Sequence, residues 1–372
     1  MQFGLNPDQI LLKDALDAFV NDRYGGAGQH RVYRAEAPGY STDNWRSLAE
    51  IGVLGLPFAA EDGGLGSGPR ELTIAFESLG SGLYVEPVLE EIVLAGGLLA
   101  RCGTQVQKEA WLPRLIAGDA HLALAHFEHA ARFALDDVRV LATKRGSAVE
   151  LEGEKSVVPL AATADQWIVS AREGDASTSP IAFYLLSPDV AGIERRDFRL
   201  IDGTCASALR FRGARTAGRL AGGCQELAAV VDVARLAAGA EMLGIMSRLF
   251  TATAEYLKTR QQFGQPLGRF QALQHRMADL YVRLEQSRSQ LYRAAASMST
   301  GSRERAIAGM KSYISRAAIE MGESCVHLHG GMGMTDELPI SHGYKRLVLL
   351  ANLFGDANSE LERFSRLRSA TG

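Results

Sequence analysis

The stretch from Glu226 to Gly264 reads ELAAVVDVARLAAGAEMLGIMSRLFTATAEYLKTRQQFG. Apolar residues recur at helical spacing along its whole length, which predicts one long helix with an apolar stripe. Two more long helical patterns follow, FQALQHRMADLYVRLEQSRSQLYRAAASM and RERAIAGMKSYISRAAIEMGESCVHLHGG. Long helices joined by short loops favour an antiparallel bundle. We therefore expect the last third of the chain to be a four-helix bundle.

The first third of the chain also has helical patterns, beginning with NPDQILLKDALDAFVNDRY. Asn6 is a candidate N-cap there, and Pro7 suits the first helical position. The middle third changes to short, partly alternating segments separated by turn residues, such as VRVLATKRGSAVELEGEKSVV and IAFYLLSP. These segments predict a small β domain of about six to eight strands, with a hairpin turn at Lys144–Ser147.

The order of the patterns is α, β, α, which predicts an α+β fold. We expect an N-terminal helical domain over residues 1–118, a barrel-like or sandwich-like β domain over 119–223, and a C-terminal bundle over 224–372. A doubly wound parallel sheet would alternate strand and helix throughout, so this fold class is excluded.

Composition limits the classes of function. Hydrophobic residues make up 47% of the 372 residues and charged residues 22%, and the formal net charge is −3, so no strong field favours nucleic acid or an anionic membrane. The start MQFGLNPDQILLKDAL has no signal-peptide features, and no apolar run approaches the roughly 20 residues of a membrane helix. The four cysteines form no CxxC pair, and the histidines show no metal-ligand spacing. We expect a cytoplasmic protein with reduced thiols and no metal.

The segment RQQFGQPLGRFQALQHRMADL combines an arginine, an aromatic residue and glutamines around a turn. Arg260 could bind phosphate oxygens as a fork, and Phe263 could pack on a heterocycle. A loop held by ordinary Arg and Gln hydrogen bonds explains the same pattern. The spacing alone leaves both readings open.

Two further features allow a functional and a structural interpretation. Gly330, Gly331 and Gly333 in LHGGMGMTDELP could let backbone approach an anion, or they could end a helix. Asp232 and Arg235 lie one turn apart on an otherwise apolar helix. They could anchor a substrate in a cleft or form a weak intrahelical ion pair.

The stretch LLANLFGDANSEL, from Leu349 to Leu361, places Asp356 directly after Gly355 at the end of an apolar run. An aspartate before a new helical run is a common N-cap. A carboxylate in a dry pocket could instead act as a general base, because burial raises its proton affinity. Asp356 is thus a candidate for either role.

Three segments in this order resemble motifs of the acyl-CoA dehydrogenase family: WRSLAEIGVLGLPFAAEDGGLG, TRQQFGQPLGRFQALQHRMADL and VHLHGGMGMTDELPISHGYKR. The resemblance covers nearly the whole chain, and the α, β, α order is similar to the family's fold. The length and the LFGDA ending resemble most the branch called pimeloyl-CoA dehydrogenase small subunits. The resemblance implies an FAD cofactor and a homodimer or homotetramer, or a hetero-oligomer with a second acyl-CoA dehydrogenase chain.

The resemblance also implies roles for individual residues. Arg260 and Phe263 match positions that hold the pyrophosphate and adenine of a neighbouring subunit's flavin. Leu267 and Gln271 follow in the same element. His327, Gly330 and Gly331 match the place where a partner chain contributes a glutamine and two glycines. Asp232 and Arg235 match helix positions near the acyl-CoA thioester.

The implied reaction is α,β-dehydrogenation of an acyl-CoA thioester. In the family a carboxylate removes a proton from Cα while a hydride leaves Cβ for flavin N5. Hydrogen bonds to the thioester oxygen must stabilise the developing enolate, as in an oxyanion hole. The electrons then pass to an electron-transfer flavoprotein. The resemblance makes Asp356 the candidate catalytic base.

Several positions depart from the family pattern. Phe127 stands where a threonine usually contacts the flavin, and the glycines that normally follow are missing from AHFEHAARFALDD. Val157 and Pro159 replace a Trp-x-Thr run, and a proline offers no N–H to the flavin. The family's Tyr-Glu-Gly is Phe354-Gly355-Asp356 here, and an alternative base position is occupied by Ala234.

These departures support a second hypothesis beside an active dehydrogenase with Asp356 as base. The chain could be the non-catalytic or flavin-completing subunit of a heteromer, lending Arg260, Phe263 and His327 to a partner's flavin while its own ring pocket is altered. A third hypothesis is a flavin-dependent monooxygenase or oxidase on the same fold.

Overall fold

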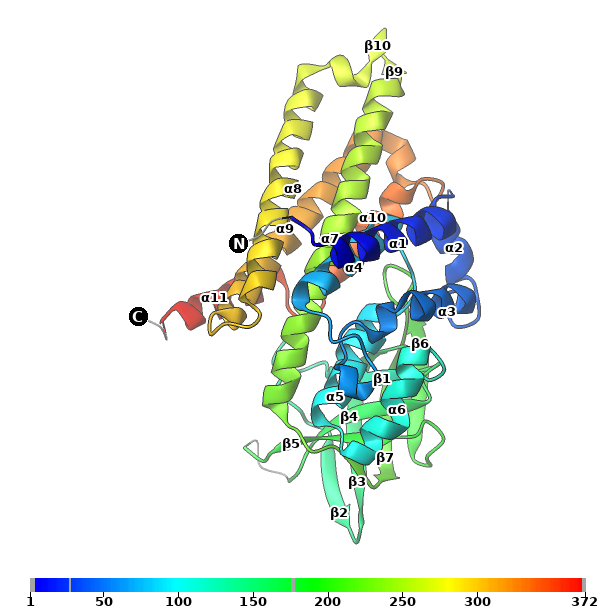
Figure 1. The fold of residues 1–372 in the computed structure, drawn as a ribbon, viewed down its shortest axis with the longest axis vertical. Helices are drawn as coiled ribbons and strands as arrows, with labels where there is room; N and C mark the ends of the chain where they lie inside the picture. Colours follow the sequence, from blue (N-terminus) through cyan, green and yellow to red (C-terminus); the bar gives the residue numbers. More distant parts are fainter. Residues whose placement is uncertain (1–3, 27, 175–177, 370–372) are drawn as a thin grey trace. The chain divides into compact units, whose positions relative to one another are not determined.

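The computed structural model describes residues 4–26, 28–174 and 178–369 (Figure 1). Its order of elements confirms the predicted succession of helices, sheet and helices. The helices before the sheet are α1 (Pro7–Tyr24), α2 (Gln29–Arg34), α3 (Thr42–Ile51), α4 (Pro69–Gly82), α5 (Gly97–Cys102) and α6 (Gln105–Ala117). Those after it are α7 (Cys224–Thr259), α8 (Gln271–Ser297), α9 (Arg303–His329), α10 (Pro339–Asn352) and α11 (Ala357–Ser369). None of the described helices is long and apolar enough to cross a membrane.

The chain divides into two compact units that do not follow the three predicted sequence domains. The first unit contains residues 1–33, 69–84 and 235–372, and the second contains 34–68 and 85–234. The predicted boundaries at 118/119 and 223/224 nevertheless fall between the last helix before the sheet, the sheet, and the first helix after it. Each unit combines segments that are distant in sequence.

The first unit is a helical assembly (Figure 1). α9 packs against α8, α10 and α11, and α1 packs against α4. α4 comes so close to α7 that a Cβ on Gly80 would lie 2.4 Å from the carbonyl oxygen of Glu241, so only glycine fits at this crossing. Arg346 from α10 donates to the buried Glu241 carboxylate at 2.6 Å. This pairing neutralises a charge in the helical core.

The second unit contains an eight-stranded sheet. Its order is β6-β7-β3-β2-β4-β5-β8, and β1 pairs in parallel with β4. The strands are β1 (Leu122–Ala125), β2 (Leu141–Arg145), β3 (Ala148–Pro159), β4 (Gln166–Arg172), β5 (Ile181–Leu186), β6 (Ile193–Arg199), β7 (Cys205–Thr216) and β8 (Gly218–Arg219). β2 and β3 form the predicted hairpin, with Arg145 opposite Ala148. The sheet's core cluster is rich in Ala, Val and Leu, with Trp167, Tyr184 and Phe211 as its large rings.

β3 contains an irregularity that matters for the site. Lys155 pairs with Leu209 of β7, but Val158 pairs with Ser207, so Ser156 and Val157 together face the single residue Ala208. Such a β-bulge bends the strand and redirects side chains, and bulges are common beside functional sites. The bulge falls in the segment that the sequence marked as unusual.

One segment is a π-helix, and one helix ends earlier than the sequence analysis predicts. The segment EEIVLAGG lies in a π-helix, Val88–Gly96, which α5 continues. The long helix α7 ends at Thr259, five residues before Gly264, because the chain turns into a short hairpin of β9 (Gln261–Gln262) and β10 (Gln265–Pro266). Phe263 and Gly264 form its turn with φ of 54° and 79°, and positive φ at both central residues is typical of a tight β-hairpin.

Candidate functional site

The β9–β10 hairpin presents the residues that the sequence analysis assigned to a dinucleotide. Phe263 is 89% exposed at the tip, and its ring lies 6.2 Å from that of Phe270 in an edge-to-face arrangement. The backbone of Arg260 is fixed at both ends, since its N–H donates to Tyr256 O and its carbonyl accepts from Leu267 N–H. Its exposed guanidinium has no ion-pair partner among the described residues. The hairpin therefore exposes the Phe263 ring and the Arg260 guanidinium to solvent.

The glycine segment after α9 lies near the end of α7 that carries this hairpin. The rings of Tyr256 on α7 and His329 on α9 stack with centroids 4.3 Å apart, and the Tyr256 hydroxyl donates to His329 O at 3.4 Å. A Cβ on Gly330 or Gly331 would meet nothing within 4 Å. The helix C-cap interpretation also holds, because the Gly330 N–H donates to His327 O. The segment therefore ends α9 and also leaves open space beside the backbone of Gly330 and Gly331.

His327 is anchored by a residue that the sequence analysis did not single out. Arg276 on α8 lies with its Nη1 2.6 Å from His327 Nδ1, and its Nη2 donates to Ser324 Oγ at 3.3 Å. The imidazole is therefore held at the start of the glycine segment. Arg276 lies inside the segment RQQFGQPLGRFQALQHRMADL, but its pattern does not distinguish it from the other arginines of α8. The half-buried Leu267 and the exposed Gln271 follow the hairpin, at η4 and at the first residue of α8.

The turn between α10 and α11 carries the candidate base. Asp356 Oδ1 accepts hydrogen bonds from Asn358 N–H at 3.0 Å and Ser359 N–H at 2.7 Å. This is N-cap geometry for α11. The carboxylate also lines an open pocket of about 420 Å³ beside α9, together with Arg316, Glu320 and Glu323. Asp356 therefore acts as the N-cap of α11, and its surroundings within this unit are polar.

The residues before Asp356 adopt an unusual backbone. Phe354 is buried with φ of 62°, and Gly355 follows with φ of 125°. A left-handed conformation is costly for an aromatic residue and persists only when its surroundings impose it. Arg235 Nε donates to Phe354 O at 2.9 Å, and Lys311 Nζ donates to Gly355 O at 2.9 Å. Two buried cations from α7 and α9 therefore hold this turn.

Lys311 is fully buried. Its ammonium also donates to Leu350 O, Ala351 O and Ser315 Oγ, each at 3.0 Å. The two helical carbonyls are among those that the end of α10 leaves without intrahelical partners. Burial lowers the pKa of Lys311 to about 7, against the raising effect of the Glu360 carboxylate. Lys311 thus caps α10 and fixes the following turn.

Arg235 is buried and makes structural contacts. Its Nη2 lies 3.0 Å from Glu360 Oε1, and both side chains are almost fully buried. Glu360 is also paired with Arg363 at 3.3 Å. Asp232 is 1% exposed. The substrate-binding role of Asp232 and Arg235 stays a prediction, while the contacts of Arg235 tie α7 to the turn before α11.

In the second unit, the segment after β1 is fastened to the β3 bulge. Phe127 is half-buried, and its carbonyl accepts from Ser156 N–H at 2.9 Å and from Ser156 Oγ at 3.1 Å. Pro159 is buried at the end of β3 opposite Ala206. The bulge and the Phe127 segment therefore form one continuous surface, with a proline where a backbone N–H would otherwise be available.

A buried ionic network lies beneath this surface. Lys155 Nζ donates to Glu128 Oε1 at 2.7 Å, Ser170 Oγ at 2.8 Å and His126 O at 3.2 Å. Glu128 also accepts from the N–H groups of Arg139 and Val140. Burial lowers the pKa of Lys155 to about 8, although the Glu128 carboxylate opposes the shift. Sequence reasoning missed this pair, because its two members are separated by 27 positions.

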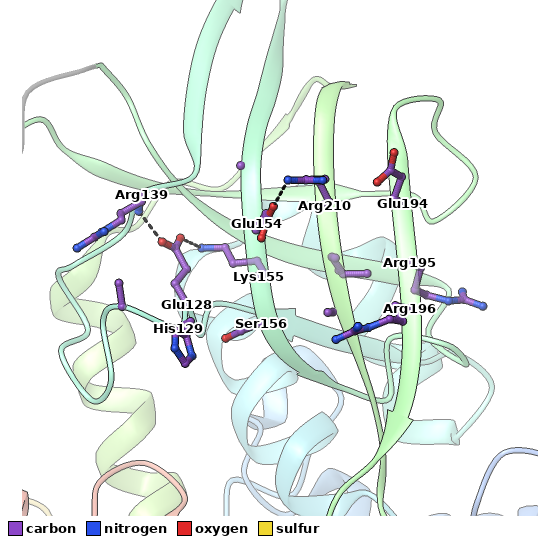
Figure 2. Close-up of a pocket in the computed structure, with 14 residues that line it drawn as sticks. Glu128, His129, Arg139, Glu154, Lys155, Ser156, Glu194, Arg195, Arg196 and Arg210 are labelled. Atoms are coloured by element: carbon purple, nitrogen blue, oxygen red, sulfur yellow. Dashed lines mark hydrogen bonds and ion pairs between the residues drawn. The ribbon is translucent and has the colours of Figure 1, made fainter.

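Above the network is an open pocket of about 790 Å³ (Figure 2). Its walls are the segment Glu128–Ala130 and the exposed faces of β3, β7 and β6. Its charged lining residues are Glu128, Arg139, Glu154, Lys155, Glu194, Arg195, Arg196 and Arg210, and His129 lies beside them. The volume is in the range of small-molecule sites.

Comparisons with known proteins agree with this arrangement. The acyl-CoA dehydrogenase N-terminal domain matches residues 6–119, and the acyl-CoA dehydrogenase C-terminal domain matches residues 221–366. The sheet lies between the two matches. The chain belongs to the acyl-CoA dehydrogenase family, the family of FAD-dependent oxidoreductases that the sequence motifs resemble. FAD is its cofactor.

Relatives cover most of the chain. Acyl-CoA dehydrogenase FadE27 of Mycobacterium tuberculosis is 29% identical over 339 residues, covering 88% of each chain. Mitochondrial isovaleryl-CoA dehydrogenase of Bos taurus is 28% identical over 377 residues, covering 97% of this chain and 87% of its own length. Among solved structures, the ChsE4-ChsE5 complex from Mycobacterium tuberculosis matches with a TM-score of 0.90 at 26% identity, covering 100% of each chain.

The described residues fit FAD unevenly. An unpaired guanidinium, an exposed aromatic ring and glycines with open space suit the pyrophosphate and adenine of a dinucleotide. At the Phe127 segment, the carbonyl of Phe127 is already engaged and Pro159 has no N–H. The hairpin therefore offers groups that suit the nucleotide half of FAD. The Phe127 segment, which is expected beside the flavin ring, offers few hydrogen-bond donors.

Proposed function

We propose that this chain is a subunit of an FAD-dependent enzyme that α,β-dehydrogenates an acyl-CoA thioester, and that a second, different acyl-CoA dehydrogenase chain supplies the catalytic base. The observation that carries the proposal is the hydrogen bonding of Asp356. Its Oδ1 holds two N–H groups at the start of α11, and the carboxylate lines an open polar pocket. A general base for a weakly acidic Cα proton needs a dry site that raises its proton affinity.

The backbone before Asp356 supports the same proposal. When the family's Tyr-Glu-Gly is matched with Phe354-Gly355-Asp356, Gly355 takes the place of the glutamate, and the carboxylate of Asp356 comes one residue later. Arg235 and Lys311 hold this turn in its left-handed conformation. The chain thus keeps a rigid turn at the base position, but the residue at that position is a glycine without a carboxylate.

In this proposal the residues of this chain bind and orient the FAD of a neighbouring subunit. Arg260 and Phe263 are displayed on a hairpin that suits the pyrophosphate and adenine of a neighbouring subunit's FAD, and His327 is fixed nearby by Arg276. Bound FAD supplies the two-electron acceptor for the hydride that leaves Cβ. An electron-transfer flavoprotein is the expected next acceptor. The similarity to the ChsE4-ChsE5 complex, a solved assembly of two named chains, favours a mixed assembly.

A second candidate keeps Asp356 as the base of this chain. The observation in its favour is that Asp356 Oδ2 has no hydrogen-bond partner among the described residues, so one oxygen remains available while the other caps α11. In an oligomer, another surface could cover the open pocket and dry it.

One substitution separates the two candidates. Asparagine is as good an N-cap as aspartate but cannot accept a proton, so Asp356→Asn preserves α11 and removes the base. We expect Asp356→Asn to retain acyl-CoA dehydrogenation and exchange of the Cα proton in the native assembly. Loss of both activities with unchanged flavin content would make Asp356 the base.

Flavin stoichiometry tests the mixed assembly. The chain expressed alone is expected to hold less than one FAD per chain, and its flavin absorbance should not bleach when acyl-CoA is added. One FAD per chain, reduced by acyl-CoA in the absence of any other chain, would contradict the proposal.

A further inference from the structure

One end of the sheet in the second unit closes into a ring. β7 pairs with β3, and the chain then needs only Ala217 to reach β8, which pairs with β5. The path β7-β3-β2-β4-β5-β8 therefore returns to its starting point at this end. The Thr216 hydroxyl fastens the closure, because it donates to Leu185 O and accepts from Gly218 N–H. A closed sheet has an inner face and an open mouth, and such mouths are common places for ligand sites.

The inner face of this ring changes from apolar to charged at the mouth. Its direction is marked by core residues on four strands, Ala142, Leu151, Ala171 and Ala214. Side chains alternate between the two faces of a strand, so the residues two positions nearer the mouth also point inward. These residues are Lys144, Val149, Glu173 and Thr216. Two charged groups therefore face the inside of the sheet at its open end.

The Glu173 carboxylate is bound by two neighbours. Glu173 continues the pairing of β4 by one residue, since its N–H donates to Pro180 O. Arg219 on β8 donates to the carboxylate from Nε at 2.6 Å and from Nη2 at 3.0 Å, and the Tyr184 hydroxyl donates to it at 2.6 Å. The Arg219 hydrogen bonds are the main reason that the pKa of Glu173 is lowered. The charge of Glu173 is therefore compensated within the sheet.

Lys144 is an inward-facing cation without such a partner. It is exposed and lies opposite Val149, and its ammonium has no hydrogen bond or ion pair with any of the described residues. Arg145, its neighbour on the outer face, pairs with Glu150 at 3.0 Å. The hydrogen-bonding capacity of Lys144 is thus unused, although the adjacent cation on the same hairpin has a carboxylate.

A pocket of about 760 Å³ lies at this open end, and we call it the mouth pocket. Its volume is in the range of small-molecule sites. Its apolar lining residues include Ala142, Val149 and Ala217, and the Tyr184 ring adds further apolar surface. The charged lining residues are Lys144, Arg219 and Glu173, so two cations and one carboxylate leave one net positive charge. The mouth pocket therefore combines apolar walls with one uncompensated cation.

We propose that the mouth pocket binds a small organic carboxylate with an aliphatic body, whose carboxylate pairs with Lys144. One free ammonium and one net positive charge match a monovalent anion. The aliphatic body lies against Ala142, Val149 and the Tyr184 ring, because alanine and valine side chains offer no hydrogen bonds to a polar body. None of the mouth-pocket residues is among those assigned to FAD or acyl-CoA, so the proposal does not depend on the proposed function.

The chemical class of the ligand is tested by calorimetric titration of the full chain, without turnover. Octanoate, octanol and octylammonium serve as probes, because they share one aliphatic body and differ in charge. We expect octanoate to bind, and the neutral and cationic probes to bind at least about fivefold more weakly, the effect of one ion pair at an exposed site. Octanol binding as tightly as octanoate would show that Lys144 does not select an anion.

The place of binding is tested with variants of the hairpin. We expect Lys144→Gln to weaken octanoate binding about fivefold and Lys144→Arg to retain it. Arg145→Gln is the matched control, because Arg145 is the adjacent cation of the same hairpin but does not line the pocket. It should leave octanoate binding unchanged. In NMR spectra, the methyl signals of Val149 should shift when octanoate is added.

Three results would overturn the proposal. Wild type could fail to bind octanoate, Lys144→Gln could bind it as tightly as wild type, or both hairpin variants could weaken it equally. Octanoate held only at another place, such as a site for an acyl group, would leave the Val149 signals unmoved and would also contradict the proposal. None of these measurements requires a catalytic base, so their failure is distinguishable from failure of the Asp356→Asn experiment.

Discussion

Lys155 in the sheet unit and Lys311 in the helical unit are both fully buried, yet they are stabilised in different ways. Lys155 lies 2.7 Å from the Glu128 carboxylate, so its charge has a nearly buried counter-charge. Lys311 has no carboxylate among its direct hydrogen-bond acceptors. It donates to three backbone carbonyls and one hydroxyl.

The difference shows what each cation does for its site. Lys155 neutralises Glu128, whose oxygens also fix the backbone of Arg139 and Val140 behind the open pocket. Lys311 satisfies carbonyls that the end of α10 leaves unpaired and binds the turn at Gly355. One lysine is needed because a charge is buried, and the other because backbone acceptors are buried.

The largest expected effect is that of Lys155→Met. It leaves the Glu128 carboxylate buried without its counter-charge, which should lower the free energy of unfolding by about 3–5 kcal/mol. Adding Glu128→Gln removes the stranded charge, so the double variant should recover a large part of the loss. Urea unfolding of the single and double variants measures both values. A double variant as unstable as Lys155→Met would show that charge pairing is not the reason.

A smaller loss, about 2 kcal/mol, is expected for Lys311→Met, because buried carbonyls lose their donor while no carboxylate loses its only partner. Glu360 keeps Arg235 and Arg363. Adding Glu360→Gln should therefore bring no recovery, opposite to the Lys155 case. Urea unfolding of the single and double variants measures both free energies. Recovery of stability in the double variant would mean that Lys311 acts mainly as a counter-charge.

The two lysines also predict a pH dependence. Both pKa values lie below the ordinary 10.5, at about 7 for Lys311 and about 8 for Lys155. Between these values and 10.5 the unfolded chain binds more protons, so each lysine makes the free energy of unfolding rise with pH. The rise begins at lower pH for Lys311. Between pH 7 and pH 9.5, wild type should gain stability relative to Lys311→Met. A constant difference would contradict the lowered pKa.

The smallest expected effect concerns the turn that Lys311 holds. Asp356→Ala removes the N-cap of α11 and should lower the free energy of unfolding by about 1 kcal/mol, whereas Asp356→Asn should change it by less than about 0.5 kcal/mol. Thermal unfolding of the two variants gives the comparison. An equal loss in both would mean that the negative charge of Asp356, and not its capping hydrogen bonds, stabilises the helix.

Local patterns predicted much of the fold. Apolar periodicity located α7, α8 and α9, and Asn6 with Pro7 begins α1 through a capping box as expected. The hairpin turn at Lys144–Ser147 was also correct, because Gly146 adopts a positive φ between two alternating strands. The end of α7 was placed too late, since Gln261 and Gln262 continue the polar face of a helix by pattern but pair as a strand with β10.

The candidate site was predictable only in part. The motifs led to the Arg260 hairpin and to the glycine segment, and the structure connects both through Tyr256 and His329. Lys311 and Glu360 lie outside these motifs, and Arg276 lies inside the first of them but was assigned no role. Their importance comes from partners on other helices, which hydrophobic periodicity cannot reveal. Arg235 was recognised as unusual, but its contacts with Phe354 and Glu360 were not foreseeable.

The sequence by itself determined the order of helices and strands, the family, and the positions where family residues are replaced, because each depends on residues close together in the chain. Tertiary structure decided what the charged residues do. Asp356 binds its own helix, Lys155 meets a carboxylate 27 positions away, and Lys311 meets carbonyls about 40 positions away. A buried charge requires a partner, and only packing determines which distant group supplies it.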